Sequence, residues 1–202
     1  HLLQPARAAA IRDVFARMFD IDLVIYLRRQ DRLKESVFAE IVKRGFAGRI
    51  EDDTHYALDF LARLDTLAAT FGRDALGVRL YREESECDRW LIDDFCAAAG
   101  LDPAGFDPHV PRQNIALHRR KTLLLSQMKV GDGSTGREFV RFLGGCDLPR
   151  DDGLRFLGSP DYHRALLDGQ RRNNTAVAER YGLSETIPAF VWTEEHDAWR
   201  PP

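Results

Sequence analysis

The sequence has 202 residues, 44% of them hydrophobic and 30% charged, which is an ordinary composition for a globular protein with one substantial core. Its 29 basic and 32 acidic side chains give a formal net charge of −3, so the chain as a whole is not a nucleic-acid binder and any phosphate site must be local. No apolar run approaches the roughly eighteen residues of a membrane span, and no signal peptide is visible, so we expect a cytoplasmic protein.

The first predicted element is an amphipathic helix. Apolar residues recur at helical spacing from Ala8 to Phe19, and Pro5 is typical of a helix start. A helix that leads directly into a buried strand is half of a βαβ unit. We therefore expect a further strand to precede it, and we interpret the sequence as the later part of a longer protein.

A short apolar run at residues 21–27 follows, rich in β-branched and aromatic side chains. Such a run predicts a strand buried on both faces, as in a parallel sheet. It ends in Arg28 and Arg29, and Asp31 is the expected N-cap of the next helix. Two arginines at the carboxyl end of a buried strand, just before a helix N-terminus, lie where open α/β sheets bind anionic ligands. We expect Ser36 to add its hydroxyl to the same anion.

A second helix–strand–helix set lies further along the chain. Residues 56–71 carry a strong apolar stripe, and Gly72 is the expected C-cap. Residues 76–81 predict a second buried strand that ends in Tyr81, and residues 87–99 predict the next helix. This αβαβα pattern is typical of an α/β fold with a parallel, doubly wound sheet, so we expect both strands in one sheet.

The second half of the chain is predicted to be mostly helical. Residues 102–113 form a Pro- and Asp-rich linker, and helices are expected from residue 114 onward, near residues 139–143 and from Pro160 to Tyr181. A basic cluster, Arg119 to Lys121, is either a solvated helix face or a source of cations for an anionic ligand. We expect residues 1–101 and residues 102–202 to be two portions of one domain.

The segment YLRRQDRLKESVF resembles bacterial sulfotransferase-like proteins of the P-loop superfamily. In that family a strand, an arginine and a serine eight residues on hold the 3′-phosphate of the sulfuryl donor PAPS, which implies this role for Arg28 and Ser36. The segments VRLYREE and DDFCAAAGL are similar to the family's second unit, which implies that Tyr81 lies near the adenine. His1 and Leu2 resemble the end of a family segment of the type Ser-Glu-His-Leu, which implies that His1 is the general base that takes the proton of the acceptor.

The resemblance implies a P-loop NTPase-like sulfotransferase that moves a sulfuryl group from PAPS to a hydroxyl or amine, on a small molecule or a glycan, and releases PAP. The family's Gly-, Lys- and Ser/Thr-bearing loop for the 5′-phosphosulfate is missing, since the Gly-rich stretch of residues 129–137 is more typical of a surface turn. No metal is expected: the histidines form no helical ligand pair, and the three cysteines form no CxxC pair. The oligomeric state stays open.

Two other functions remain open from the sequence. One is a non-catalytic, sulfotransferase-like interaction protein that has lost donor binding, whose melting temperature neither PAP nor PAPS would change. The other is a different P-loop transferase, such as a small-molecule kinase, which would carry an upstream Walker loop with magnesium carboxylates.

Overall fold

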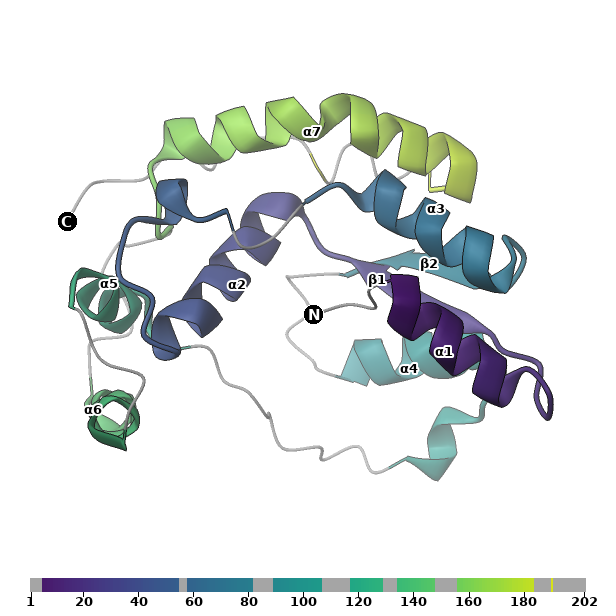
Figure 1. The fold of residues 1–202 in the computed structure, drawn as a ribbon, viewed down its shortest axis with the longest axis horizontal. Coiled ribbons are helices and arrows are strands. Elements are labelled where there is room, and N and C mark those ends of the chain that lie inside the picture. Colours follow the sequence, from purple (N-terminus) through teal and green to yellow (C-terminus); the bar gives the residue numbers. More distant parts are fainter. Residues whose placement is uncertain are drawn as a thin grey trace. The chain divides into compact units, whose positions relative to one another are not determined.

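The computed structural model describes residues 5–54, 58–81, 89–106, 117–128, 134–147, 156–183 and 190. It is a mixed α/β structure, mostly helical, with one pair of parallel strands among these residues (Figure 1). None of the described helices is both long enough and apolar enough to cross a bilayer. The elements in chain order are α1 (Pro5–Phe15), β1 (Leu23–Leu27), α2 (Gln30–Lys43), η1 (Ile50–Asp52), α3 (Phe60–Phe71), β2 (Leu76–Leu80), α4 (Arg89–Ala99), η2 (Pro103–Gly105), α5 (Arg119–Gln127), α6 (Ser134–Gly145) and α7 (Pro160–Tyr181).

The chain divides into two compact units, and both draw on segments before and after residue 101. The chain passes from one unit to the other five times, first just after β1 and the fourth time inside α7. Unit 1 comprises His1–Arg28, Asp59–Gln113 and Arg172–Ala189, and unit 2 comprises Arg29–Leu58, Asn114–Arg171 and Phe190–Pro202.

Unit 1 is built around the parallel pair of β1 and β2. Leu23 is in register with Leu76 and Leu27 with Leu80, so the prediction that both strands share one parallel sheet is confirmed. In the structure α3 packs against β2 and α1, and α4 packs against β1 (Figure 1). The residues of β1 are half-buried except Leu27, which is buried, so the strand is less enclosed than its apolar sequence predicted.

Both ends of α3 are set by capping residues that are adjacent to the helix in the sequence. Asp59 is the N-cap, and its carboxylate accepts a hydrogen bond of 2.9 Å from the backbone N–H of Ala62. Asn173, from the last turns of α7, donates its side-chain amide to the same carboxylate at 2.6 Å. At the other end Gly72 has φ +93°, which confirms it as the C-cap because that backbone conformation strains any residue with a Cβ.

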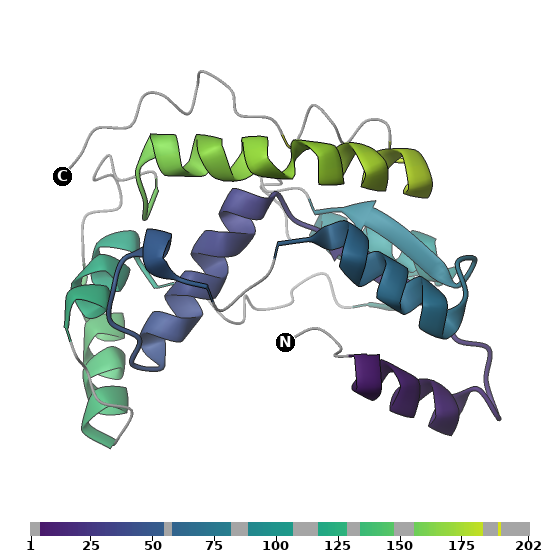
Figure 2. The same cartoon turned by 45° about the horizontal axis from the view of Figure 1, so that its top comes forward.

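Unit 2 is helical and has its own hydrophobic core. In it α2 packs against α5 and η1, and α5 packs against α6 (Figure 2). The buried core residues are Phe38, Val42, Ile50, Leu125 and Leu143. Helix α6 begins at Ser134, five residues before the predicted start, so the end of the Gly-rich stretch of residues 129–137 belongs to a helix.

Two buried lysines tie the elements of unit 2 together. The ammonium of Lys34 on α2 donates to both the carboxylate and the backbone carbonyl of Asp53, which fixes the chain just after η1. Lys121 on α5 donates to the carbonyls of Gly144 and Cys146, which are acceptors at the end of α6. Lys34 therefore provides a donor for the buried backbone carbonyl of Asp53, and Lys121 links α5 to the end of α6.

The loop before α7 is closely packed at Gly158. A Cβ on this residue would lie 2.9 Å from Cγ2 of Ile50 and 3.0 Å from Cδ1 of Tyr162. Helix α7 itself begins at Pro160 and ends at Tyr181, as the sequence predicted.

Candidate functional site

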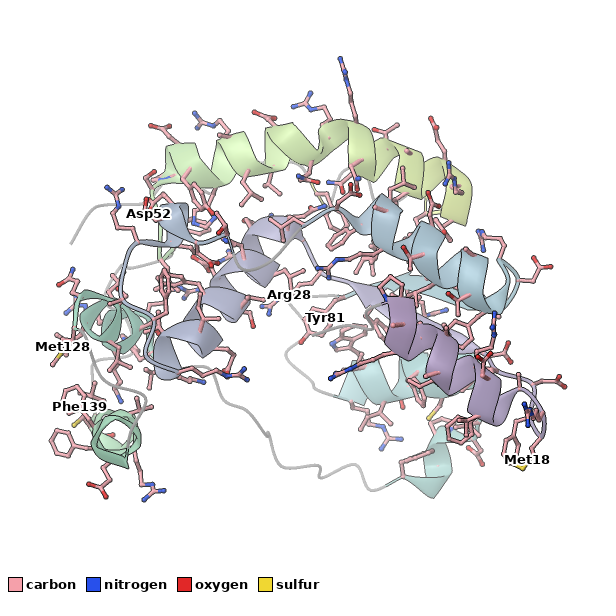
Figure 3. All side chains as sticks on the ribbon, in the orientation of Figure 1. Met18, Arg28, Asp52, Tyr81, Met128 and Phe139 are labelled. Atoms are coloured by element: carbon pink, nitrogen blue, oxygen red, sulfur yellow. The ribbon has the colours of Figure 1, made fainter. Side chains whose placement is uncertain are left out.

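Arg28 and Tyr81 meet at one edge of the sheet in unit 1. Each is the first residue after its strand, and because β1 and β2 run parallel, their carboxyl ends lie at the same edge. The guanidinium carbon of Arg28 lies 5.5 Å from the centroid of the Tyr81 ring (Figure 3). The backbone N–H of Tyr81 donates to the carbonyl of Leu27 at 2.8 Å, so main-chain pairing continues up to this contact. Two residues that were selected separately from the sequence therefore form a cation–π pair.

A second aromatic side chain, that of Trp90 on α4, extends this pair. Its ring meets the Tyr81 ring edge-on at 5.5 Å and the Tyr26 ring edge-on at 6.3 Å. Tyr26 is the last but one residue of β1, and Arg28 is the first residue after it, so the Trp90 ring connects the end of β1 to the end of β2. Tyr81 keeps 38% of its surface exposed, so a planar group in solution can reach this aromatic cluster.

Asp94 holds Tyr26, one of the three rings of the cluster, in place. The hydroxyl of Tyr26 donates to the Asp94 carboxylate at 2.7 Å, and Arg79 donates to both carboxylate oxygens at 2.5 Å. Burial and the hydrogen bond to Asp94 raise the pKa of Tyr26 to about 12, so its hydroxyl stays protonated at neutral pH. The same bidentate pairing raises the pKa of Arg79. Arg79 is thus a fixed partner of Asp94 rather than a free surface charge.

The first turn of α2 differs from the prediction. Arg29, not Asp31, is the N-cap, and Asp31 lies inside the helix with its side chain fully buried. The Asp31 carboxylate accepts two hydrogen bonds from the Arg29 guanidinium, at 2.7 and 2.8 Å, and one of 2.8 Å from the backbone N–H of Arg32. An internal carboxylate therefore occupies the anion-favouring end of the helix. Ser36 lies in the second turn and is exposed.

The other sequence candidates fall in different places. His1 lies outside the described residues. Within the basic cluster, Arg119 lies 3.6 Å from the carboxylate of Glu35, and Arg120 is exposed. Lys121 is buried on α5 and donates to a carbonyl at the end of α6. Two of the three cations thus contribute to the packing of unit 2.

Glu35 is the centre of a buried polar cluster in unit 2. Its carboxylate accepts a 2.6 Å hydrogen bond from the backbone N–H of Leu157 and lies 3.5 Å from Arg32, 3.6 Å from Arg119 and 3.6 Å from Nε2 of His163. Burial raises the pKa of Glu35 although both arginines oppose the shift, and burial lowers the pKa of His163 to about 4. His163 is therefore neutral at pH 7. Because its side chain is fully enclosed, it serves packing rather than contact with a substrate.

Sequence reasoning missed Trp90, Asp94 and Tyr26 as parts of the site. A signal was present, because Trp90 and Asp94 are four residues apart on a predicted helix and therefore share one face. Among the described residues no group of three or more His, Cys, Asp and Glu side chains is arranged to hold a metal ion.

No family model, curated protein or solved structure matches this chain.

Proposed function

We propose that this chain is the part of a PAPS-dependent sulfotransferase that holds the 3′-phosphate and adenine of the donor. The observation that carries the proposal is the contact of Arg28 with Tyr81 at the carboxyl edge of two parallel strands. This edge is where α/β proteins bind nucleotides. The resemblance of residues 26–38 to bacterial sulfotransferases supports the choice of donor.

Arg28 has the chemistry that a phosphomonoester requires. A guanidinium offers a planar fork of donors that matches phosphate oxygens, and it keeps its charge at any physiological pH. The half-buried position of Arg28 strengthens this interaction, because charge-assisted hydrogen bonds gain from partial removal of water. Its contact with the Tyr81 ring holds the guanidinium in place before a ligand arrives.

Tyr81 and Trp90 supply an aromatic surface for the purine. A nucleobase stacks on aromatic side chains irrespective of its hydrogen-bonding edge, and each such contact contributes about 1–3 kcal/mol in nucleic-acid complexes. Tyr81 is exposed enough to be reached, and Trp90 supports it from α4. A cation and an aromatic ring side by side match a ligand that carries both a phosphate and a purine.

The remaining parts of the proposal depend on the resemblance. It assigns Ser36 a hydrogen bond to the 3′-phosphate, His1 the role of base, and a hydroxyl or amine the role of acceptor. It also implies the doubly wound P-loop sheet and a cytoplasmic, bacterial protein. Sulfuryl transfer depends on positioning and on cations that spread the oxyanion charge. Arg28 and Tyr81 would anchor the non-reacting end of the donor, so that its binding energy orients the reacting end.

Calorimetric titration of PAP and of adenosine 5′-monophosphate, which lacks the 3′-phosphate, tests the proposal. The wild-type chain should bind PAP more tightly than the monophosphate, and Arg28→Ala should remove that preference. The loss of one charge-assisted contact of about 1.5–3 kcal/mol corresponds to a PAP affinity that is weaker by a factor of about 10 to 150. Arg17→Ala is the matched control, because it removes an exposed arginine of the same unit with the same change in net charge.

Three results would contradict the proposal: no measurable PAP binding by the wild type, equal PAP affinity in the wild type and Arg28→Ala, or an equal loss in Arg17→Ala. Tyr81→Ala should weaken the binding of both nucleotides, because both carry the adenine, and should weaken PAP binding more, because the Arg28 guanidinium loses the ring that holds it. If only PAP binding became weaker, Tyr81 would act on the 3′-phosphate and not on the adenine.

An interaction protein without donor binding is the second candidate function. One observation favours it: five apolar side chains on and just after α1 are exposed by 42–68%, which is an unusual density for a solvent-facing surface. These residues are Ile11, Val14, Phe15, Met18 and Phe19. The nucleotide titration separates the two functions, because an interaction protein should bind neither PAP nor the monophosphate.

A further inference from the structure

Unit 1 contains a cavity of about 320 Å³ beside the aromatic cluster, and this cavity is open to solvent. One wall is Tyr26 of β1, a second is one face of α4, and Phe106, which follows η2, forms the third. In the part of the chain that the structure describes, the residues that line it are Tyr26, Leu91, Ile92, Phe95, Cys96 and Phe106. The four residues from α4 have the spacing i, i+1, i+4 and i+5, so they form one continuous helical stripe.

The described side chains that line the cavity offer few hydrogen-bonding groups to a ligand. Among the described residues that line it none is charged, and the one hydroxyl among them, that of Tyr26, donates to Asp94. The bidentate contact of Arg79 holds Asp94 in place, so the acceptor of the Tyr26 hydroxyl is fixed and the hydroxyl already has a partner. Cys96 contributes only a thiol, which is a weak donor and behaves as a small apolar group. A polar or charged occupant would therefore lose its hydration without compensation.

The size of the cavity selects a small molecule. A volume of about 320 Å³ lies at the lower end of the range for ligand sites, whereas a stable protein partner needs about 1,000 Å² or more of complementary surface. Phe95 and Phe106 are exposed by 42% and 44%, so an apolar occupant would also remove their rings from water.

We propose that this cavity binds an uncharged, apolar small molecule with one or two fused rings or a hydrocarbon group of similar volume. The site needs neither Arg28 nor a nucleotide, so it stands independently of the proposed sulfotransferase function. Removal of apolar surface from water provides the affinity, and the apolar side chains of the described lining make the site selective against charged analogues.

The probe for the test is 1-fluoronaphthalene, titrated against the full chain and followed by ¹⁹F NMR. Saturable binding is expected. Leu91→Trp, which fills the cavity, should weaken it at least tenfold, whereas Ala97→Trp should leave it unchanged within twofold. Ala97 is exposed on the opposite face of the same helix, so it is a matched control for the added indole. The carboxylate analogue 4-fluoro-1-naphthoate should bind at least tenfold more weakly than 1-fluoronaphthalene.

A second measurement does not depend on the cavity-filling variant. In a chain with Cys87→Ser and Cys146→Ser, saturating 1-fluoronaphthalene should slow the reaction of Cys96 with methyl methanethiosulfonate at least threefold. Absence of saturable binding, equal affinity in Leu91→Trp and Ala97→Trp, or no protection of Cys96 would overturn the proposal. Arg28→Ala should leave fluoronaphthalene binding intact, so the result is separate from the outcome of the PAP titration.

Discussion

Replacing Lys34 by methionine should destabilise the protein far more than replacing Lys43, although both lysines lie on α2 and pair with a carboxylate. The distance from the ammonium nitrogen to the carboxylate oxygen is 2.5 Å for Lys34 with Asp53 and 2.6 Å for Lys43 with Glu40. The two pairs differ in burial. The side chains of Lys34 and Asp53 are 4% and 0% exposed, against 22% and 52% for Lys43 and Glu40.

The expected magnitudes follow from that difference. An exposed pair contributes about 0–1 kcal/mol, because water solvates either ion nearly as well alone. Removal of one partner from a buried pair costs about 3–5 kcal/mol, because the remaining charge stays in a poorly hydrated site. Lys34 also donates to the carbonyl of Asp53, so its loss removes a donor from a buried backbone group as well. Methionine keeps most of the side-chain volume, which limits any packing effect.

Urea denaturation, monitored by circular dichroism, should show a loss of about 3–5 kcal/mol for Lys34→Met and less than about 1 kcal/mol for Lys43→Met. Hydrogen exchange of α2 peptides would show whether the loss lies in unit 2. The double variant Lys34→Met with Asp53→Asn should recover part of the stability, since it removes the buried charge that the single variant leaves behind. Equal losses for Lys34→Met and Lys43→Met, or no recovery in the double variant, would refute this reasoning.

Three further predictions concern pH and packing. Burial lowers the folded-state pKa of His163 to about 4 from an ordinary 6.5, so the unfolded chain binds more protons between these two pH values. The free energy of unfolding should therefore fall as the pH drops through this window. In urea titrations from pH 7 to pH 4.5, His163→Gln should reduce the slope of that fall. Asp94→Asn should lower the pKa of Tyr26 from about 12, visible as a difference between the two ultraviolet titrations of tyrosinate, and an unchanged pKa would show that burial alone sets it. Gly158→Ala should destabilise the protein by about 1–3 kcal/mol through overpacking. Gly169 has open space around it in the middle of α7, so Gly169→Ala should stabilise the protein by up to about 1 kcal/mol. A loss of stability in both variants would contradict the packing argument.

Part of the candidate site could be predicted because it depends on local sequence. An apolar run that ends in Arg28, and a second that ends in Tyr81, identify two strand ends, and a parallel sheet brings such ends to one edge. Trp90 could not be assigned in the same way, because its ring orientation depends on how α4 packs against β1. The role of Asp31 was also misjudged. Its residue type favours an N-cap, but the contact with Arg29 places it one position beyond the first residue of the helix.

The sequence by itself determined the apolar strands, the glycine that ends α3 and the proline that begins α7, because each depends on backbone preferences and on the spacing of neighbouring residues. Only the tertiary structure decided which charges on α2 are buried. Lys34 and Glu35 look like ordinary solvent-facing residues of an amphipathic helix, yet their partners are Asp53, nineteen residues away, and Leu157, 122 residues away. A charge can leave water only where hydrogen-bonding groups from distant segments replace its hydration, and that condition is met by packing, not by local sequence.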